Sequence, residues 1–545
     1  MVELDGSGWY QFSDGAAAIA GMPTQQGAAA HMINRFRTGR FRTGHGHPRG
    51  SNRTSAELGL CFLAFGVVMG LARPAHAASI LQQFQGGTLS QSGFTPPDMG
   101  GSVGGGYVVQ LLNGVATIDT TAGAPVSQTS LDTFFGQTGT LSDPRIVFDP
   151  ASQRWFASAV TVVGSTATAN SVLLAVSSGA NPTAGFTTLS FASANTTTFA
   201  DFPTLGVNGA AVTIGTNDFS TSTANFLGAS LYSVPKSDLT GATPTVANRS
   251  SFIQITNLGS APQAVSNVGG GTTTTSVVSV ATTRTGTPVY ALSTVTGANT
   301  GAAALSLTAT YDSTQIANAA QLNTNLVAPT QPGGTTYDPG DTRISSGAYQ
   351  AGNNIYFANT VANTATGATS DVISWAVLNA TTTGVVAQGT LSMSGLSLTY
   401  PSISANANGT FVIAFNGSGT GTNITDYYVI CSAITGTCGA PQTTFSSATN
   451  NYSVAPAGTN RWGDYSWTTV DPTNANNFWL FQEYASSTPV PAFGTTTSWG
   501  TVITQISAAT STPVPEPAGL ALLAVGLGGL GLALRRRAGE RSRTR

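Results

Sequence analysis

Short apolar runs alternate with turns along most of the chain. Between residues 78 and 510, runs of four to eight residues rich in Val, Ile, Phe, Tyr and Trp are separated by Gly, Asn and Asp. Runs of this kind are typical of β-strands, and this stretch has no helical period of useful length. The same runs can bury a core, which disfavours disorder. The pattern therefore predicts an all-β body.

A strand–turn–strand unit recurs in this body. Asp143 to Val160 contains two strands joined by an Asp-Pro turn, and Asp464 to Tyr484 repeats the order. Looser copies begin at Asp201, Asp341 and Tyr400, so starts fall about sixty residues apart with one double interval. Residues 265–280 fill that interval and residues 98–119 precede the first start. This gives seven units.

Seven such units predict a single β-propeller, since none can bury both of its faces alone. Closure is expected to pair residues 80–84 with the last blade near residues 499–503. A pair of β-sandwiches is the competing fold, and the repeated register favours the propeller. The segments 95–98, 104–110, 143–155, 228–236 and 461–466 also resemble blade motifs of exported bacterial propeller proteins of unassigned activity.

Composition excludes several functions. Charged residues make up 8% of the chain, against about 25% in typical proteins, and the predicted body has no basic surface for nucleic acid. All four histidines lie before residue 78, so histidine triads and histidine-ligated metals are excluded from the body. Two cysteines remain there, Cys431 and Cys438, and their spacing across a glycine-containing turn predicts a disulfide rather than a metal site.

The C-terminal stretch carries a sorting motif. Val514, Pro515, Glu516 and Pro517 precede an apolar run over residues 518–534 and three arginines at 535–537. This arrangement resembles the PEP-CTERM signal of Gram-negative bacteria. The resemblance implies an exosortase-type sorting enzyme as a partner and transient insertion of residues 518–534 into the inner membrane. The alternative is an ordinary C-terminal anchor helix.

The N-terminal stretch predicts export. Residues 58–72 form an apolar run after a basic segment, and Ala75-His76-Ala77 fits a cleavage site. The expected organisation is an N-terminal extension with signal peptide over 1–77, the propeller over 78–510 and the sorting signal with its transmembrane segment over 511–545. The protein is then a membrane-anchored precursor that reaches the cell surface, outer envelope or extracellular matrix.

Repeated acids suggest a binding site at one end of the propeller channel. If each starts an inner strand, they form a ring with nearby arginines and a tyrosine: Asp143, Arg145, Asp201, Asp341, Arg343, Asp464 and Tyr465. Such a ring can bind sugars, phosphates or Ca²⁺. The favoured interpretation is nevertheless structural, since a repeated Asp also caps backbone amides or ties neighbouring blades together.

Three functions fit these patterns. The favoured one is a non-catalytic binding or scaffold protein linked to exopolysaccharide or biofilm. A glycan-active hydrolase or lyase is the alternative, although no spacing singles out an acid–base pair and the sialidase-type Asp box is absent. An ice-binding or adhesin role is the third. The tryptophans of the body are expected in the blade core rather than on a sugar-stacking surface.

Overall fold

The computed structural model describes residues 79–162, 168–268, 270–282, 286–363, 370–446, 450–454, 460–491, 495 and 497–509. The expected signal peptide and sorting signal, including the apolar runs 58–72 and 518–534, lie outside these residues. Within the described ranges, no helix has both the length and the apolar character needed to cross a bilayer. The helices α1 (Leu89–Ser92), α2 (Leu131–Phe134) and α3 (Lys236–Thr240) are short connectors.

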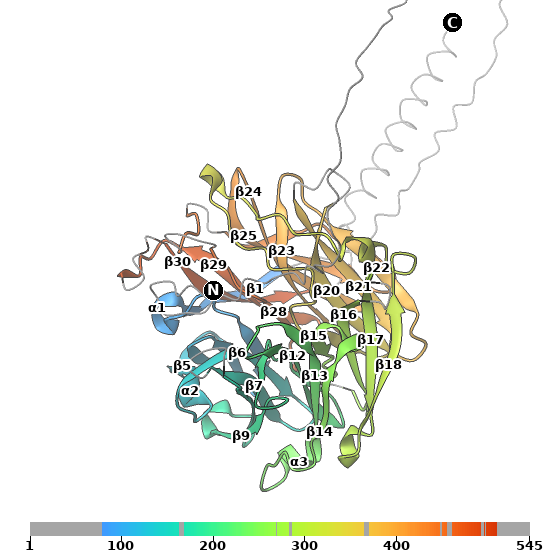
Figure 1. Cartoon of the computed structure of the whole chain (residues 1–545). Helices are drawn as coiled ribbons and strands as arrows, with labels where there is room; N and C mark the ends of the chain where they lie inside the picture. The colour runs from blue at the N-terminus through green and yellow to red at the C-terminus, as the bar shows by residue number, and fades with distance from the viewer. Residues whose placement is uncertain are drawn as a thin grey trace, which may run out of the picture. The chain divides into compact units, whose positions relative to one another are not determined.

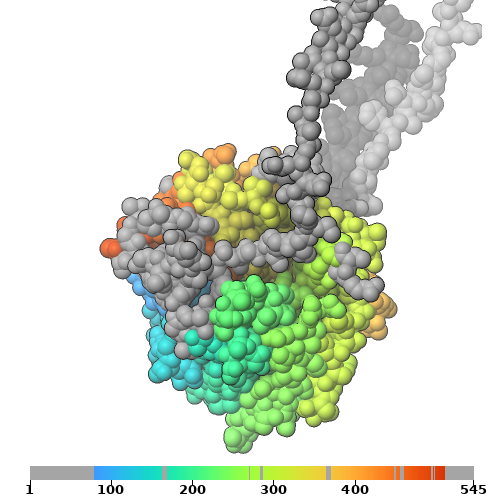
Figure 2. Space-filling model, viewed as in Figure 1, coloured from blue at the N-terminus to red at the C-terminus, as the bar shows by residue number. Residues whose placement is uncertain are grey.

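The body is a seven-bladed β-propeller, as the repeated units predict. Seven antiparallel sheets follow one another along the chain, and each is one blade. In Figure 1 the labels of β6, β15 and β28 lie near the middle, and those of β5, β9, β14 and β18 lie towards the rim. Figure 2 shows successive parts of the chain as adjacent coloured sectors. Within each blade, successive strands of the sheet lie progressively farther from the central channel.

The first four blades have the following strands. Blade 1 contains β2 (Gly100–Gly104), β3 (Tyr107–Leu112), β4 (Val115–Thr120) and β5 (Pro125–Ser130). Blade 2 contains β6 (Thr140–Asp149), β7 (Arg154–Val162), β8 (Ser171–Ser177) and β9 (Phe186–Ala192). Blade 3 contains β10 (Thr198–Asp201), β11 (Gly206–Val207), β12 (Ala211–Ser220), β13 (Phe226–Pro235) and β14 (Ser250–Ile255). Blade 4 contains β15 (Ser260–Ala264), β16 (Thr275–Thr282), β17 (Pro288–Thr296) and β18 (Ala304–Tyr311).

The last three blades complete the ring. Blade 5 contains β19 (Tyr349–Ala351), β20 (Asn354–Ala362), β21 (Asp371–Asn379) and β22 (Val385–Leu391). Blade 6 contains β23 (Ser397–Ala405), β24 (Thr410–Gly419), β25 (Thr422–Ser432), β26 (Thr437–Cys438) and β27 (Gln442–Ser446). Blade 7 contains β28 (Trp467–Val470), β29 (Asn477–Ser486), β30 (Ser498–Ser507) and the N-terminal strand β1 (Ser79–Thr88).

Blade 7 closes the ring through the pairing that the sequence predicts. Strand β1 lies antiparallel to β30, with Phe84 opposite Ile503 and Ser79 opposite Ser507. The side chain of Gln82 also donates to Gln505 Oε1 at 2.8 Å. The outermost strand of the last blade therefore comes from the opposite end of the described chain.

Among the described residues, four of the seven blades share a backbone kink near their start. Asp143, Phe202, Ala261 and Tyr400 have φ values of 57°, 52°, 46° and 52°, and a proline follows each of them. Strand register shifts at this point in β6, β15 and β23. Proline is tolerated because the innermost strand is an edge strand, where no ladder donor is needed. The third unit therefore starts at Phe202, one residue later than the predicted Asp201.

The buried core bears on two further predictions. Trp155 of β7 and Trp479 of β29 are fully buried in the blade core, as predicted. Trp462 is buried in the connection before β28 and Trp467 lines the channel, so the prediction of a blade-core position is wrong for these two. Cys431 and Cys438 form a disulfide that joins β25 to β26.

Candidate functional site

Arg145 of β6 extends across the central channel. Its Nη2 donates to the backbone oxygen of Ser345, which precedes β19 on the far side of the ring, at 3.0 Å. The guanidinium lies 3.3 Å from the ring centroid of Tyr465 and 5.1 Å from that of Phe202. Arg145 is fully buried, and its Nε and Nη1 have no hydrogen-bond partner. Four blades thus meet at this one side chain.

Two buried aspartates flank this arginine and connect neighbouring blades. Asp143 accepts a hydrogen bond from the backbone N–H of Phe202 at 3.1 Å, which joins blade 2 to blade 3. Asp98 accepts one from the backbone N–H of Asp464 at 2.8 Å, which joins blade 1 to blade 7. Asn113 links the two, since its Nδ2 donates to Asp98 at 2.7 Å and its Oδ1 accepts from the Asp143 N–H at 2.9 Å. Both carboxylates are therefore bound to backbone amides.

A second group of charges lies closer to solvent. Arg461 bonds to the carboxylate of Asp464, and its Nε lies 3.6 Å from Asp338 Oδ2. These three side chains are between 21% and 26% exposed. Tyr400 OH donates to the backbone oxygen of Asp338 at 2.5 Å and so holds this segment beside the channel.

The Asp341–Arg343 pair forms the other exposed part of the mouth. Arg343 Nε lies 2.8 Å from both carboxylate oxygens of Asp341, whose side chain is 42% exposed. The Arg343 guanidinium lies 5.0 Å from the ring centroid of Phe202. Phe202 therefore contacts two arginines, Arg145 from the channel and Arg343 from the rim.

The predicted ring is only partly formed. Asp143, Arg145, Asp464 and Tyr465 come together, and Arg343 with its partner Asp341 reaches them through Phe202. The expectation of equal register is wrong for Asp201, because Phe202 holds the kinked position that Asp143 holds in blade 2. It is also wrong for Asp341, which lies in the connection before β19 rather than at the start of that strand. Asp98 belongs to the cluster although the predicted ring omitted it, and its place at the start of the first unit was the available signal.

Burial and charge shift the acidities in this cluster. Burial, together with the charges of Asp464 and Asp143, raises the pKa of Asp98 well above its usual range. Burial and Asp464 also raise the pKa of Asp143. Burial lowers the pKa of Arg145, whereas the charge of Asp464 raises that of Arg461. The buried layer therefore favours neutral carboxyls, and the exposed layer favours charged pairs.

Two long connections meet at this mouth, and we call residues 331–338, 450–454 and 460–463 the cap. Gln331 donates to the backbone oxygen of Tyr452 at 3.1 Å and accepts from its N–H at 2.7 Å. Asn460 Nδ2 donates to the backbone oxygen of Thr336 at 3.0 Å, and its own backbone oxygen accepts from the Asp338 N–H at 2.9 Å. The connections hold one another, and they carry Asp338 and Arg461.

Two further buried acids lie beneath the cap and were not predicted together. Asn416 Nδ2 donates to Asp426 Oδ1 at 2.5 Å and to the backbone oxygen of Glu483 at 3.2 Å, while its Oδ1 accepts from Trp462 Nε1 at 3.2 Å. Asp426 and Glu483 are 1% and 2% exposed, and one oxygen of each has no partner. Burial raises the pKa of both well above the usual range.

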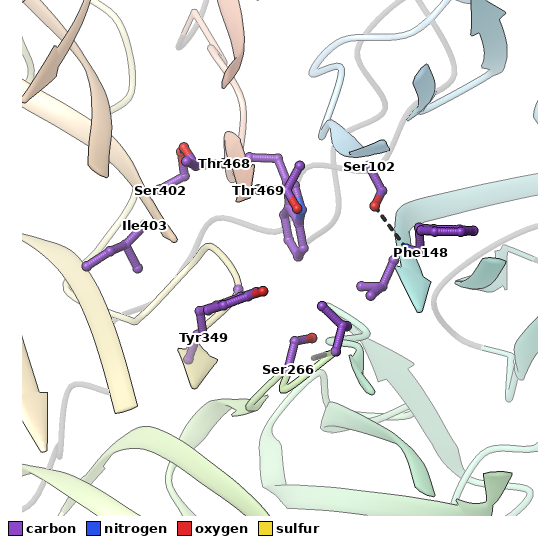
Figure 3. A pocket seen from close by; sticks show the side chains of 13 residues that line it. Ser102, Phe148, Ser266, Tyr349, Ser402, Ile403, Thr468 and Thr469 are labelled. Carbon is purple, nitrogen blue, oxygen red and sulfur yellow. Dashed lines mark hydrogen bonds between the residues drawn. The ribbon is translucent and has the colours of Figure 1, made fainter. Parts of the chain in front are cut away.

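The channel also holds an uncharged recess farther along the inner strands (Figure 3). Its walls include Ser102, Ser266, Tyr349, Ser402 and Thr469, and none of its lining residues is charged. Trp467 lines the recess and lies 5.3 Å from the Arg145 guanidinium. The side chain of Trp467 therefore stands between the recess and the charged cluster.

The described part of the chain holds no group of three or more His, Cys, Asp and Glu residues arranged to hold a metal ion. The exposed aspartates of the mouth are bonded to arginines instead. The expectation of Ca²⁺ as a candidate ligand therefore gains no support from a ligand cluster among these residues.

Comparison with known proteins gives weak likenesses. No family model matches the chain, and no curated protein matches it. A protein of unknown function from Dyadobacter fermentans is 10% identical with a TM-score of 0.38, covering 79% of this chain and 99% of its own. The β-propeller domain of the trilobed protease from Pyrococcus furiosus is 7% identical with a TM-score of 0.33, covering 80% and 99%. Trypanosoma rangeli sialidase is 8% identical with a TM-score of 0.34, covering 79% and 60%. Likenesses this distant assign neither a family nor a function.

Proposed function

We propose that this propeller is the body of an exported surface or matrix protein that binds a polysaccharide without turning it over. The binding site is the channel mouth with its two exposed charge groups, Asp341–Arg343 and Asp338–Arg461–Asp464. Carboxylates and guanidinium groups that hold each other in fixed positions offer acceptors and donors to sugar hydroxyls. The proposal also includes export, an exosortase-type partner and transient membrane insertion, which rest on the sequence resemblance.

One observation carries the preference for binding over catalysis. Asp98 and Asp143 are bonded to backbone amides of neighbouring blades, and the exposed aspartates of the mouth are bonded to arginines. A glycosidase needs one carboxyl free to donate a proton and a second free to attack or to activate water. These acids are committed to other partners, which favours a binding role. A hydrolase or lyase remains the alternative function.

The test measures binding and turnover together. The secreted body is incubated with extracellular polysaccharides, and both retained polysaccharide and released products are quantified. We expect retention without products, and we expect the double change Asp341→Asn with Asp464→Asn to abolish retention while the melting temperature stays nearly unchanged. Asp238→Asn, on α3 and away from the mouth, is the matched control. Release of oligosaccharides by the wild type would decide for the enzyme.

A further inference from the structure

The cap rests on two carboxyl groups that are poorly satisfied as anions. Trp462 donates to Asn416, and Asn416 in turn donates to Asp426 and to the backbone of Glu483. Gly463 lies so close that a side-chain carbon there would stand 3.0 Å from Glu483 Oε2. The free oxygens, Asp426 Oδ2 and Glu483 Oε1, are buried without a donor. A protonated carboxyl tolerates this environment far better than a carboxylate does.

The groups that face these carboxyls do not supply a compensating positive charge. Glu483 is influenced by Asp98 of blade 1 and Asp426 of blade 6, and its charge acts on Tyr337 and Tyr452 of the cap. Asp426 also acts on Tyr427 of its own strand and on Tyr484 of β29. Arg461, next to Trp462 in the chain, is bonded to Asp464 and Asp338 instead. Ionisation of both acids would therefore place two repelling charges beneath the cap.

We propose that the cap is a pH-operated cover, docked while Glu483 and Asp426 carry protons and lifted from blades 6 and 7 when both are ionised. Lifting lets water reach the carboxylates and breaks the bond from Trp462 to Asn416. It also moves Arg461, so the proposed binding mouth is remodelled. Only this last consequence rests on the proposed function, because docking of the cap can be measured without any ligand.

The experiment follows the indole N–H of Trp462 in the full-length protein labelled with ¹⁵N-tryptophan. Trp479 is the internal reference, since its Nε1 donates to Asp471 Oδ2 at 2.9 Å in blade 7. Between about pH 5 and about pH 9, protection of the Trp462 N–H from solvent exchange should fall about tenfold relative to Trp479. The signal is assigned with Trp462→Phe. A constant ratio across this range would overturn the proposal.

Neutral variants separate this device from general effects of pH. Glu483→Gln with Asp426→Asn should keep the cap docked at every pH, so the relative change should disappear. Asp218→Asn is the matched control, because Asp218 is also a fully buried acid but lies in blade 3. It should leave the change intact. If the double variant does not fold, Glu483→Gln alone must reduce the change, and an undiminished change would refute the mechanism. If the wild type shows the expected change in Trp462 protection but retains no polysaccharide, the result counts against the proposed function alone.

Discussion

At the residue scale, Asp143 and Asp341 should behave differently although both belong to the predicted ring. Asp143 is 6% exposed and accepts the Phe202 N–H, so Asp143→Ala leaves a buried backbone donor without a partner. We expect a loss of about 1–3 kcal/mol in the free energy of unfolding. Asp341→Asn should cost less than about 1 kcal/mol, because exposed ion pairs contribute little. Urea unfolding measures both, and equal losses would contradict the distinction.

Gly347 gives a second test at this scale. A Cβ atom at this position would lie 2.7 Å from Trp467 Cη2, in the wall between the recess and the charged cluster. Gly347→Ala should therefore cost about 1–3 kcal/mol through overpacking. Gly179→Ala is the control, since a Cβ atom there meets nothing within 4 Å. Denaturant midpoints for the two variants should differ clearly, and a neutral Gly347→Ala would show that Trp467 can move aside.

The sequence predicted some of the acids that meet at the channel mouth, but not the groups to which they bond. Asp143 and Asp464 were expected at one end of the channel because they begin similar units, and they do meet there. The predicted start at Asp201 is one residue too early, because the kink is the residue with positive φ before the proline, here Phe202, and not the aspartate itself. Contacts between blade 6, blade 7 and the cap bring together Asn416, Asp426 and Glu483. Such contacts leave no local pattern in the sequence.

At the element scale, β1 should be essential to the ring. A chain beginning at Leu89 lacks the strand that covers β30, and it loses the contact between Phe84 and Trp479. We expect a loss of at least about 3 kcal/mol, together with self-association through the bare edge of β30. Urea unfolding and size-exclusion chromatography, compared with a chain beginning at Ser79, measure these effects. An unchanged midpoint and a monomeric profile would contradict the importance of this closure.

Closure, blade number and most inner strands were predictable because the strand–turn–strand unit repeats in the sequence. The outer strands were less visible. Strand β14, for example, alternates half-buried and exposed positions over most of its length and has no buried residue, so it lacks the signature of a core strand. The connection between β18 and β19 lies mostly within the double interval between predicted unit starts. No local sequence pattern indicates that this connection contacts residues 450–454.

At the scale of the whole molecule, stability should fall as pH rises through the mildly acidic range. Burial raises the pKa of Asp119, Asp218 and Asp371 to about 6. Between about pH 4 and about pH 6 the folded state then binds more protons than the unfolded state, so the free energy of unfolding decreases with increasing pH. Each group contributes up to about 3 kcal/mol.

Urea midpoints measured from about pH 4 to about pH 8 test this dependence. Asp218→Asn should flatten part of the curve, whereas Asp238→Asn, at the surface of α3, should leave its shape unchanged. Stability that instead increased with pH over this range would mean that the buried acids are better satisfied as anions than their contacts indicate.

The pairing of Ser79 with Ser507 has a consequence for how the protein is made. The first strand of the body leaves the ribosome without a partner and must wait for β30, the last strand of the described chain. A chain that stops before β30 contains the strands of blades 1 to 6 but cannot complete blade 7. Completion of the ring thus reports that synthesis has passed β30, and proteases that remove unclosed chains would distinguish closed rings from shorter fragments.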